Sequence, residues 1–300
     1  MRTKLMFMTA GIAAATLALA GCAGGDSGTG DAGAGSEESG AAYEVATDVT
    51  LEGSPTFDAM TSADQVTIGV KEDQPGLGYL DAATGERSGF DIEIAKWIAA
   101  SLGFSEDQIE YTAIPSANRE ASIVNGDIDY YVGTYSITDK RKEQVGFAGP
   151  YFETGQQLLV AADNDSIEGP DDLTAETTVC SATGSTPIQN IRTNYPDVPT
   201  EEFDTYSQCV DALNDGQVDA VTTDGAILIG YAAQSPDELK VVGEPFSTEL
   251  YGVGLAKDDT ALRGFINDMF TEGGDTWTAI YDETLGESGT EVEQPAVDAY

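Results

Sequence analysis

Residues 126–141 decide the fold that we predict, and they read Gly126-Asp127-Ile128-Asp129-Tyr130-Tyr131-Val132-Gly133-Thr134-Tyr135-Ser136-Ile137-Thr138-Asp139-Lys140-Arg141. The first half is a short apolar run after a glycine, which predicts a buried strand after a helix end. Ligands of open α/β sheets bind beyond the carboxyl ends of the strands, so we expect Gly133, Thr134 and Ser136 at a ligand site. Arg141 then offers a planar guanidinium to a carboxylate. The alternative is a strand followed by a capped helical turn without a ligand.

Strand and helix patterns alternate around this stretch. Residues 66–70 and 109–114 read as buried strands, and residues 89–102 and 115–125 read as helices. The order strand, helix, strand, helix, strand predicts a parallel sheet with helices on its faces. A second α/β unit follows from about residue 177, so we expect two lobes of mixed α/β structure.

The two units share a spacing. Gly126 is followed by Thr134 after eight residues, and Gly216 is followed by Asp224 at the same distance, each at the end of a predicted strand. If the lobes are built alike and face each other, Thr134 and Asp224 meet across a cleft. Chance alignment of two similar strands is the alternative.

The chain opens with basic residues and an apolar run that ends in Leu19-Ala20-Gly21-Cys22. This ending resembles the lipobox of bacterial lipoproteins, which implies a signal peptide over residues 1–21 and a diacylated Cys22. Two acyl chains anchor a protein stably in a membrane, where one is marginal. An ordinary signal peptide with an incidental cysteine is the alternative.

Composition divides the rest of the chain. Residues 22–62 are rich in glycine, serine, alanine and acidic residues, and we expect a flexible acidic tether there. The folded part is expected over residues 63–286, and residues 287–300 are expected to form a loose acidic tail.

The formal net charge is −40, from 13 basic and 53 acidic residues. Nucleic acid and anionic lipid surfaces are therefore poor partners. The sequence contains no histidine, which removes the commonest metal ligand and the usual general base. We expect neither a metal nor a cofactor.

Three cysteines are present, and lipidation of Cys22 leaves Cys180 and Cys209. Outside the cytosol, an even pair predicts a disulfide. Two buried thiols and a metal site are the alternatives.

Two motifs carry a resemblance to a known family. Gly89-Phe90-Asp91-Ile92-Glu93-Ile94-Ala95 and the stretch from Gly133 to Arg141 resemble the helix start and the ligand loop of family 3 solute-binding proteins. These are the extracytoplasmic receptors of polar amino acid ABC importers, and the whole chain is similar to actinobacterial glutamate-binding lipoproteins. The resemblance implies a monomeric, two-lobed type II periplasmic-binding-protein fold that binds its ligand by lobe closure.

The same resemblance places the lobe boundaries. Lobe 1 is expected over residues 63–160 and 250–286, and lobe 2 over residues 161–249. The two hinge crossings are expected near residues 158–163 and 248–253.

The resemblance also assigns roles at the amino acid's backbone. Arg141 falls where the family grips the α-carboxylate, and Thr134, Ser136 and Thr186 fall where hydroxyls and amides assist. Asp224 and the carbonyl of Gly133 fall where the α-ammonium is held. A zwitterion needs a fixed cation and a fixed anion, which suits this set.

The side-chain end of the site decides the substrate. Ser116-Ala117-Asn118-Arg119 resembles the stretch of aspartate/glutamate receptors in which the serine and the arginine contact the distal carboxylate. Lys71 falls where those receptors carry an arginine, and it lacks the planar fork. The alternatives are a helix N-cap for Ser116, a surface residue for Arg119 and a solvated loop charge for Lys71. Aromatic packing on the ligand is expected from Tyr206, with Tyr79 and Tyr135 as further candidates.

These expectations define a glutamate receptor that delivers its ligand to an ABC permease on the extracytoplasmic face of the cell membrane. Aspartate and glutamine are the alternative ligands. A dehydratase on the same fold is a less favoured reading, with Glu72 or Asp73 as its acid. A sensor domain would need a transmembrane segment in the folded part, and we find none there.

Overall fold

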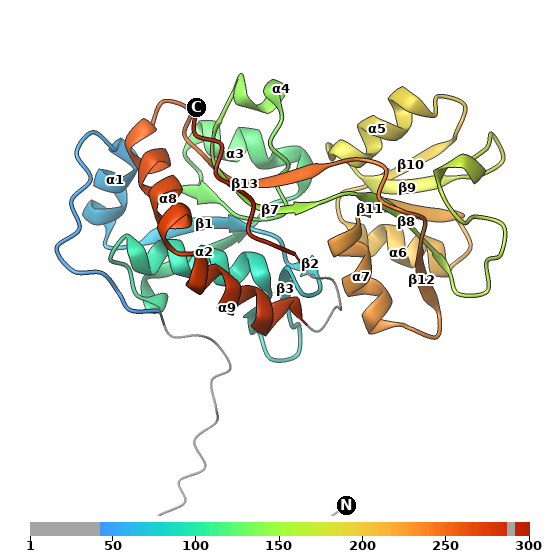
Figure 1. Ribbon diagram of the computed structural model, residues 1–300, viewed down its shortest axis with the longest axis horizontal. Helices are drawn as coiled ribbons and strands as arrows, with labels where there is room; N and C mark the ends of the chain where they lie inside the picture. The colour runs from blue at the N-terminus through green and yellow to red at the C-terminus, as the bar shows by residue number, and fades with distance from the viewer. Residues whose placement is uncertain (1–42, 287–291) are drawn as a thin grey trace, which may run out of the picture. The chain divides into compact units, whose positions relative to one another are not determined.

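The computed structural model describes residues 43–286 and 292–300 (Figure 1). The predicted signal peptide, Cys22 and the first half of the predicted tether lie outside the described residues. Two five-stranded sheets and one small three-stranded sheet organise the described part of the chain. No helix described there is both long and apolar enough to cross a bilayer.

The first sheet belongs to lobe 1. β1 pairs in parallel with β5 and β6, as the alternating strand and helix pattern predicts, whereas β13 is antiparallel to both of its neighbours. β1 is buried over almost its whole length because both faces of the sheet are covered. In sheet order, the strands are β5 (Ile109–Ala113), β1 (Val66–Val70), β6 (Tyr130–Tyr131), β13 (Glu249–Leu255) and β7 (Gly146–Thr154).

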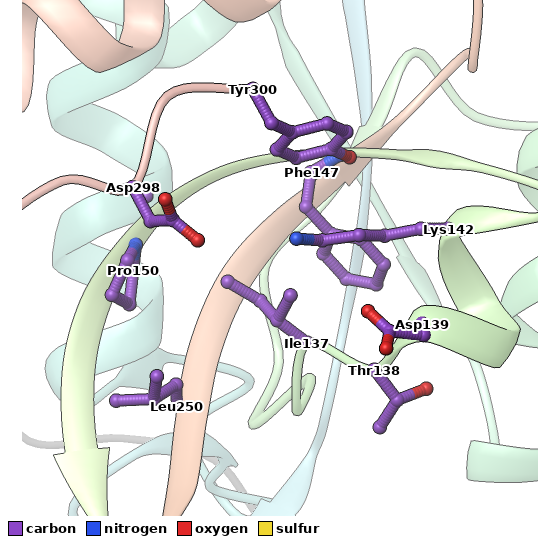
Figure 2. A pocket seen from close by; sticks show the side chains of 10 residues that line it. Ile137, Thr138, Asp139, Lys142, Phe147, Pro150, Leu250, Asp298 and Tyr300 are labelled. Carbon is purple, nitrogen blue, oxygen red and sulfur yellow. The ribbon is translucent and has the colours of Figure 1, made fainter.

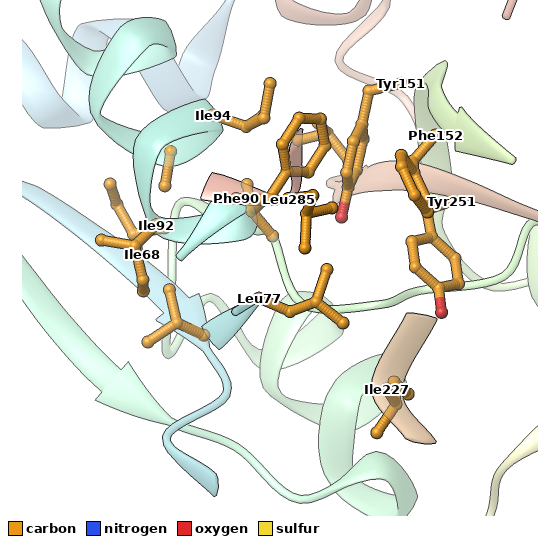
Figure 3. Packing of buried hydrophobic residues seen from close by; sticks show 14 of the residues in the cluster. Ile68, Leu77, Phe90, Ile92, Ile94, Tyr151, Phe152, Ile227, Tyr251 and Leu285 are labelled. Carbon is orange, nitrogen blue, oxygen red and sulfur yellow. The ribbon is translucent and has the colours of Figure 1, made fainter. Parts of the chain in front are cut away.

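Helices cover both faces of this sheet. The apolar side chains of α2 (Phe90–Ser101), α8 (Thr260–Glu272) and α9 (Gly274–Thr284) share one core cluster, and α3 (Arg119–Asn125) contributes to another. Figure 3 shows part of the larger cluster, with Phe90 and Phe152 among its side chains. The ring of Phe90 lies 5.2 Å from that of Phe152 and 5.7 Å from that of Trp277. The predicted family helix start therefore lies at the centre of lobe 1.

Short elements complete lobe 1. β2 pairs with β3, and β3 pairs with β4, in a small antiparallel sheet beside the start of α2. The short elements are β2 (Asp73–Gln74), β3 (Gly78–Leu80), β4 (Arg87–Ser88), α4 (Asp139–Lys142) and the 3₁₀ turns η1 (Glu106–Gln108) and η2 (Ser116–Asn118).

The second sheet belongs to lobe 2, and its helices are α5 (Thr186–Asn194), α6 (Tyr206–Asn214) and α7 (Gly225–Gln234), with the turn η3 (Pro170–Asp172). The predicted disulfide is confirmed, because Cys180 on β9 is bonded to Cys209 on α6. In sheet order, the strands are β10 (Thr200–Phe203), β9 (Val179–Ala182), β11 (Ala220–Asp224), β8 (Gln156–Ala161) and β12 (Leu239–Val242).

The predicted lobe boundaries at residues 160 and 161 are wrong by one strand. β8 pairs with β11 and β12 and so belongs to lobe 2. The first crossing is therefore at Gly155, and the second lies over residues 243–248. A Cβ at Gly155 would lie 2.4 Å from the carbonyl oxygen of Ser247, so the two crossings are in contact. An apolar run identifies a buried strand but does not reveal which sheet the strand joins.

The predicted tether also ends earlier than residue 62, because α1 (Pro55–Ala63) packs on lobe 1. The Ser54 hydroxyl accepts a hydrogen bond from the Phe57 amide, and Asp259 of lobe 1 accepts one from the Ser54 hydroxyl. Phe57 and Met60 are buried. Two apolar anchors and a serine cap are enough to fix a helix in an otherwise polar segment.

The predicted loose tail is wrong for residues 292–300. The Tyr300 hydroxyl accepts a hydrogen bond from the Phe147 amide at 2.9 Å, and the Lys142 ammonium lies 4.0 Å from the centre of the Tyr300 ring. The Asp298 amide donates to the carbonyl of Gly149. Figure 2 shows Tyr300 and Asp298 at a cavity of about 370 Å³ beside α4. The acidic composition of this segment predicts a loose tail and gives no sign of these contacts.

Candidate ligand-binding site

The predicted site residues meet where the strand ends of the two lobes face each other. A cavity of about 10 Å³ lies between the lobes, enough for about one water molecule. The lobes must therefore move apart before a larger ligand enters. Seven of the residues around this cavity were predicted from the sequence, and two were not; the nine are Ser116, Arg119, Thr134, Ser136, Ser185, Thr186, Pro187, Tyr206 and Asp224.

The larger cavity beside α4 contains none of the ten predicted ligand residues. Lys71, Gly133 and Arg141, the predicted residues that do not line the smaller cavity, bond to residues that do or adjoin them in the chain. We therefore place the candidate site at the smaller cavity.

The loop after β6 is held in an uncommon conformation. Thr134 has φ 46°, which is unfavourable for a β-branched residue. Its amide donates to Asp91 Oδ2 at 2.9 Å, and its hydroxyl donates to Gln74 Oε1 at 3.1 Å. Burial raises the pKa of Asp91 to about 6, and the hydrogen bond from Tyr151 opposes the rise. The sequence assigned Asp91 to the helix start but missed that it holds the loop.

The lobe 1 end of the site is cationic. Lys71 Nζ donates to Ser116 Oγ at 2.9 Å, and Arg119 Nε donates to the Ser116 carbonyl at 3.1 Å. Arg119 also donates to the Thr134 carbonyl, and its guanidinium lies 4.4 Å from the centre of the Tyr135 ring. Burial, followed by repulsion from Arg119, lowers the pKa of Lys71 to about 7.

The alternative interpretations of these three residues are not supported. Lys71 is 5% exposed and Arg119 is 2% exposed, so neither is a surface charge. Ser116 is the first residue of η2 rather than its cap, and its hydroxyl faces Lys71. No described carboxylate lies within ion-pair distance of Lys71 or Arg119.

Arg141 joins the two lobes. Its Nη1 donates to the Ser136 carbonyl at 2.7 Å, and its Nη2 donates to the carbonyl of Gly184 in lobe 2 at 3.1 Å. Its Nε donates to Glu120 at 3.1 Å, a partner that the sequence did not reveal. Burial, followed by repulsion from Arg119, lowers the pKa of Arg141 to about 10. Separation of the lobes would break the bond to Gly184 and free one donor for a ligand.

The lobe 2 end of the site is acidic. Asp224 ends β11, and its Oδ2 accepts a hydrogen bond from the Tyr251 hydroxyl at 2.7 Å. Its Oδ1 is buried without a hydrogen-bond partner among the described residues. Burial, followed by repulsion from Glu249, raises the pKa of Asp224 to about 7. An unpartnered buried carboxylate oxygen is costly unless a cation reaches it.

A chain of hydroxyls crosses the cavity. Ser136 Oγ of lobe 1 lies 3.1 Å from Thr186 Oγ1 of lobe 2, and Thr186 Oγ1 donates to Glu249 Oε2 at 2.9 Å. A hydroxyl has one proton, so Ser136 is the donor to Thr186 in this arrangement. Glu249 was not predicted, because a strand-initial glutamate carries no distinctive sequence signal.

The three tyrosines predicted as possible ligand contacts lie in different positions relative to the cavity. Tyr206 is buried and lines the cavity. Tyr135 lies beneath both Arg119 and Arg141, at 4.4 and 5.0 Å from ring centre to guanidinium carbon, and so supports cations. Tyr79 is half-buried on β3 and does not line the cavity. No group of described side chains has the composition of a metal site.

Two α/β lobes joined by two crossings, with charged strand ends around an interlobe cavity, define a two-lobed binding protein. Residues 66–287 match the model of the bacterial extracellular solute-binding proteins, family 3, and the chain belongs to that family.

Named relatives agree with this assignment. The chain is 42% identical to the glutamate-binding protein GluB of Corynebacterium efficiens, over 81% of this chain and 86% of that protein. It is 40% identical to a glutamine-binding protein of Geobacillus stearothermophilus, over 80% of this chain and 87% of that one. The crystal structure of a cysteine-binding protein from Campylobacter jejuni matches with a TM-score of 0.74 and 28% identity, over 81% of this chain and 98% of that one.

Proposed function

We propose that this protein captures L-glutamate outside the cytoplasm and delivers it to the permease of an ABC importer. The observation that carries the proposal is an unbalanced charge at each end of the site. Among the described residues, Lys71 and Arg119 are buried without a carboxylate partner, and Asp224 is buried with one oxygen that accepts no hydrogen bond. Glutamate supplies a distal carboxylate to the first pair and an ammonium to the second.

The α-carboxylate falls between these ends. Arg141 is its principal partner, assisted by the amides and hydroxyls of Thr134, Ser136 and Thr186. The Gly133 carbonyl assists Asp224 with the ammonium, and Tyr206 packs against the ligand. The free-energy requirement is modest, since a micromolar dissociation constant corresponds to about 8 kcal/mol. Two or three charge-assisted hydrogen bonds, at roughly 1.5–3 kcal/mol each, approach that value.

Glutamine is the second candidate ligand. A glutamine-binding relative is 40% identical to this chain. Burial also lowers the pKa of Lys71 to about 7, and a neutral lysine accepts an amide more readily than a charged one does. Glutamine would, however, leave the Arg119 guanidinium buried without an anion.

We propose no enzymatic activity for this protein. The two acids considered for a dehydratase are both engaged elsewhere. Glu72 lies 3.6 Å from Arg87 and is exposed, whereas Asp73 accepts hydrogen bonds from two backbone amides of lobe 2. The relatives described above are named as binding proteins, which supports a binding role.

A calorimetric titration against the twenty amino acids tests the ligand assignment. We expect glutamate to bind most tightly, with glutamine and aspartate weaker. Tight binding of a basic or an apolar amino acid, with none of glutamate, would refute the proposal.

The membrane anchor is part of the same proposal. Cys22→Ser removes the thiol that acylation requires, so we expect the variant to be released into the medium. Fractionation of cells that express the full chain measures this. Retention of the variant in the membrane fraction would contradict a lipid anchor.

A further inference from the structure

We infer that a contact outside the ligand cavity sets how tightly this protein holds any ligand. The contact, called here the clasp, joins Asp73 and Pro75 of lobe 1 to the N-terminus of α6 and to Gly230 and Tyr231 of α7 in lobe 2. The inference rests on the proposed function for its ligand, although the clasp itself is a feature of lobe contact.

Asp73 provides the polar half of the clasp. One oxygen, Oδ2, accepts hydrogen bonds from the amide of Tyr206 at 3.0 Å and the amide of Ser207 at 3.2 Å. The Tyr231 hydroxyl lies 3.2 Å from the same oxygen and also donates to the Asp73 carbonyl. All of these donors belong to lobe 2, and Asp73 belongs to β2 of lobe 1.

The amides concerned would otherwise lack partners. The first amides of a helix have no acceptor within the helix, and the N-terminus carries a partial positive charge. The side chain of Thr205 caps α6 by accepting from the Gln208 amide, which leaves the amides of Tyr206 and Ser207 to another acceptor. Lobe 1 supplies that acceptor, so α6 is fully capped only when the lobes meet.

Gly230 provides the steric half of the clasp. It lies within α7, and a Cβ at this position would be 2.2 Å from the carbonyl oxygen of Pro75. Backbone cannot yield at that distance as the end of a flexible side chain can. The lobes reach their present approach only because position 230 carries no side chain.

Asp73, Pro75, Gly230 and Tyr231 do not line the ligand cavity. Tyr206 does line it, but its part in the clasp is its backbone amide. A contact that forms on closure but does not touch the ligand shifts the equilibrium between open and closed forms equally for every ligand. The clasp therefore sets affinity, whereas Lys71 and Arg119 set specificity.

Two variants test the clasp from its two halves, each with a matched control. Asp73→Ala removes the carboxylate that accepts the hydrogen bonds of the clasp. Its control, Asp219→Ala, removes a carboxylate that accepts a hydrogen bond from the Thr178 amide at 2.7 Å, within lobe 2 alone. Gly230→Ala introduces the steric conflict, and Gly264→Ala makes the same change in α8, where nothing lies within 4 Å. Alanine is the better helix former, so neither glycine variant should lower the melting temperature of the ligand-free protein.

We expect both clasp variants to bind glutamate and glutamine about tenfold more weakly. The ratio of the two dissociation constants should be unchanged in Gly230→Ala, whereas Asp73→Ala also removes a carboxylate that raises the pKa of Lys71 and should weaken glutamate somewhat more than glutamine. Stopped-flow binding should place most of the loss in the dissociation rate. Small-angle scattering without ligand should show a larger radius of gyration than in the wild type. The two controls should match the wild type in every readout.

The readouts separate this inference from the proposed function. Clasp variants that match the wild type in affinity and in radius of gyration would overturn the clasp, as would a loss confined to one ligand. A wild type that binds no amino acid, beside clasp variants that are still more open, would refute the proposed function and support the clasp.

Discussion

The two lobes present opposite charges to the cavity between them. Lobe 1 contributes Arg119, which lines the cavity, together with Lys71 and Arg141, which bond to residues that line it, whereas lobe 2 contributes Asp224 at the end of β11. Of these four residues, Arg141 alone has a carboxylate partner in the described part of its own lobe, Glu120. The remaining charges are balanced neither within their lobes nor, among the described residues, by an ion pair across the cavity.

This difference divides the work of recognition. Every α-amino acid carries the carboxylate and the ammonium that Arg141 and Asp224 suit, so these two residues do not choose among amino acids. Under the proposed function, the choice among amino acids falls to Lys71 and Arg119, which would penalise a ligand without a distal anion more than they reward the correct one.

We expect the largest loss of affinity from a change at Arg141, the proposed partner of the α-carboxylate that all amino acids share. Arg141→Met should weaken glutamate and glutamine binding alike by more than about 100-fold, because two charge-assisted hydrogen bonds are lost. Calorimetry measures both ligands. The control is Arg192→Met, which removes an exposed arginine paired with Glu202 in lobe 2. Glutamate affinity within tenfold of the wild type would mean that Arg141 joins the lobes without holding the ligand.

The next largest effect is expected at Arg119, the proposed partner of the ligand's distal carboxylate. Arg119→Met should weaken glutamate binding by about 2 kcal/mol or more, roughly 30-fold, and glutamine binding far less. The matched control is Arg87→Met, which removes a lobe 1 arginine paired with Glu72 outside the cavity. A change of less than about twofold in glutamate affinity would remove the main physical support for glutamate.

A pH profile sharpens the same division. Burial raises the pKa of Asp224 to about 7, so protonation below pH 7 removes the partner of the ammonium, and both ligands should bind more weakly at pH 5. Burial lowers the pKa of Lys71 to about 7, so deprotonation above pH 7 should weaken glutamate alone. Each limb approaches at most about tenfold per pH unit. An alkaline limb of equal size for glutamine would contradict the role of Lys71.

The smallest effect tests whether contacts of lobe 1 outside the interlobe cavity change the affinity for the ligand. Tyr300→Ala removes a hydrogen bond to the Phe147 amide and the contacts of the ring with Lys142 and Arg263. The free energy of unfolding should fall by about 1 kcal/mol. Chemical denaturation measures this, with glutamate affinity expected to remain unchanged. A large loss of affinity would show that the tail positions α4 and Arg141.

The sequence predicted the parts of this molecule that depend on local pattern. The buried strand before Gly133, the helix after Gly89 and the spacing that brings Thr134 and Asp224 to strand ends are all legible in neighbouring residues. The pairing of β8 was missed because an apolar run predicts a buried strand but not the sheet that the strand joins. α1 and residues 292–300 were missed because a few anchors outweigh a polar composition.

Contacts made only in three dimensions were also missed. The Asp91 carboxylate accepts a hydrogen bond from the amide of Thr134, 43 residues away in the sequence. The Asp73 carboxylate accepts one from the amide of Tyr206, 133 residues away. Neither carboxylate differs in sequence from the many acidic residues on the surface of a chain with a net charge of −40.

A crystal structure with bound glutamate tests the central claim most directly, because it shows which lobe holds which end of the ligand. We expect the distal carboxylate within hydrogen-bond distance of Lys71 Nζ and the Arg119 guanidinium, and the ammonium on Asp224 Oδ1. The contradicting result is a ligand whose side chain points away from Lys71 and Arg119, with both residues keeping only their present partners, Ser116 and Thr134.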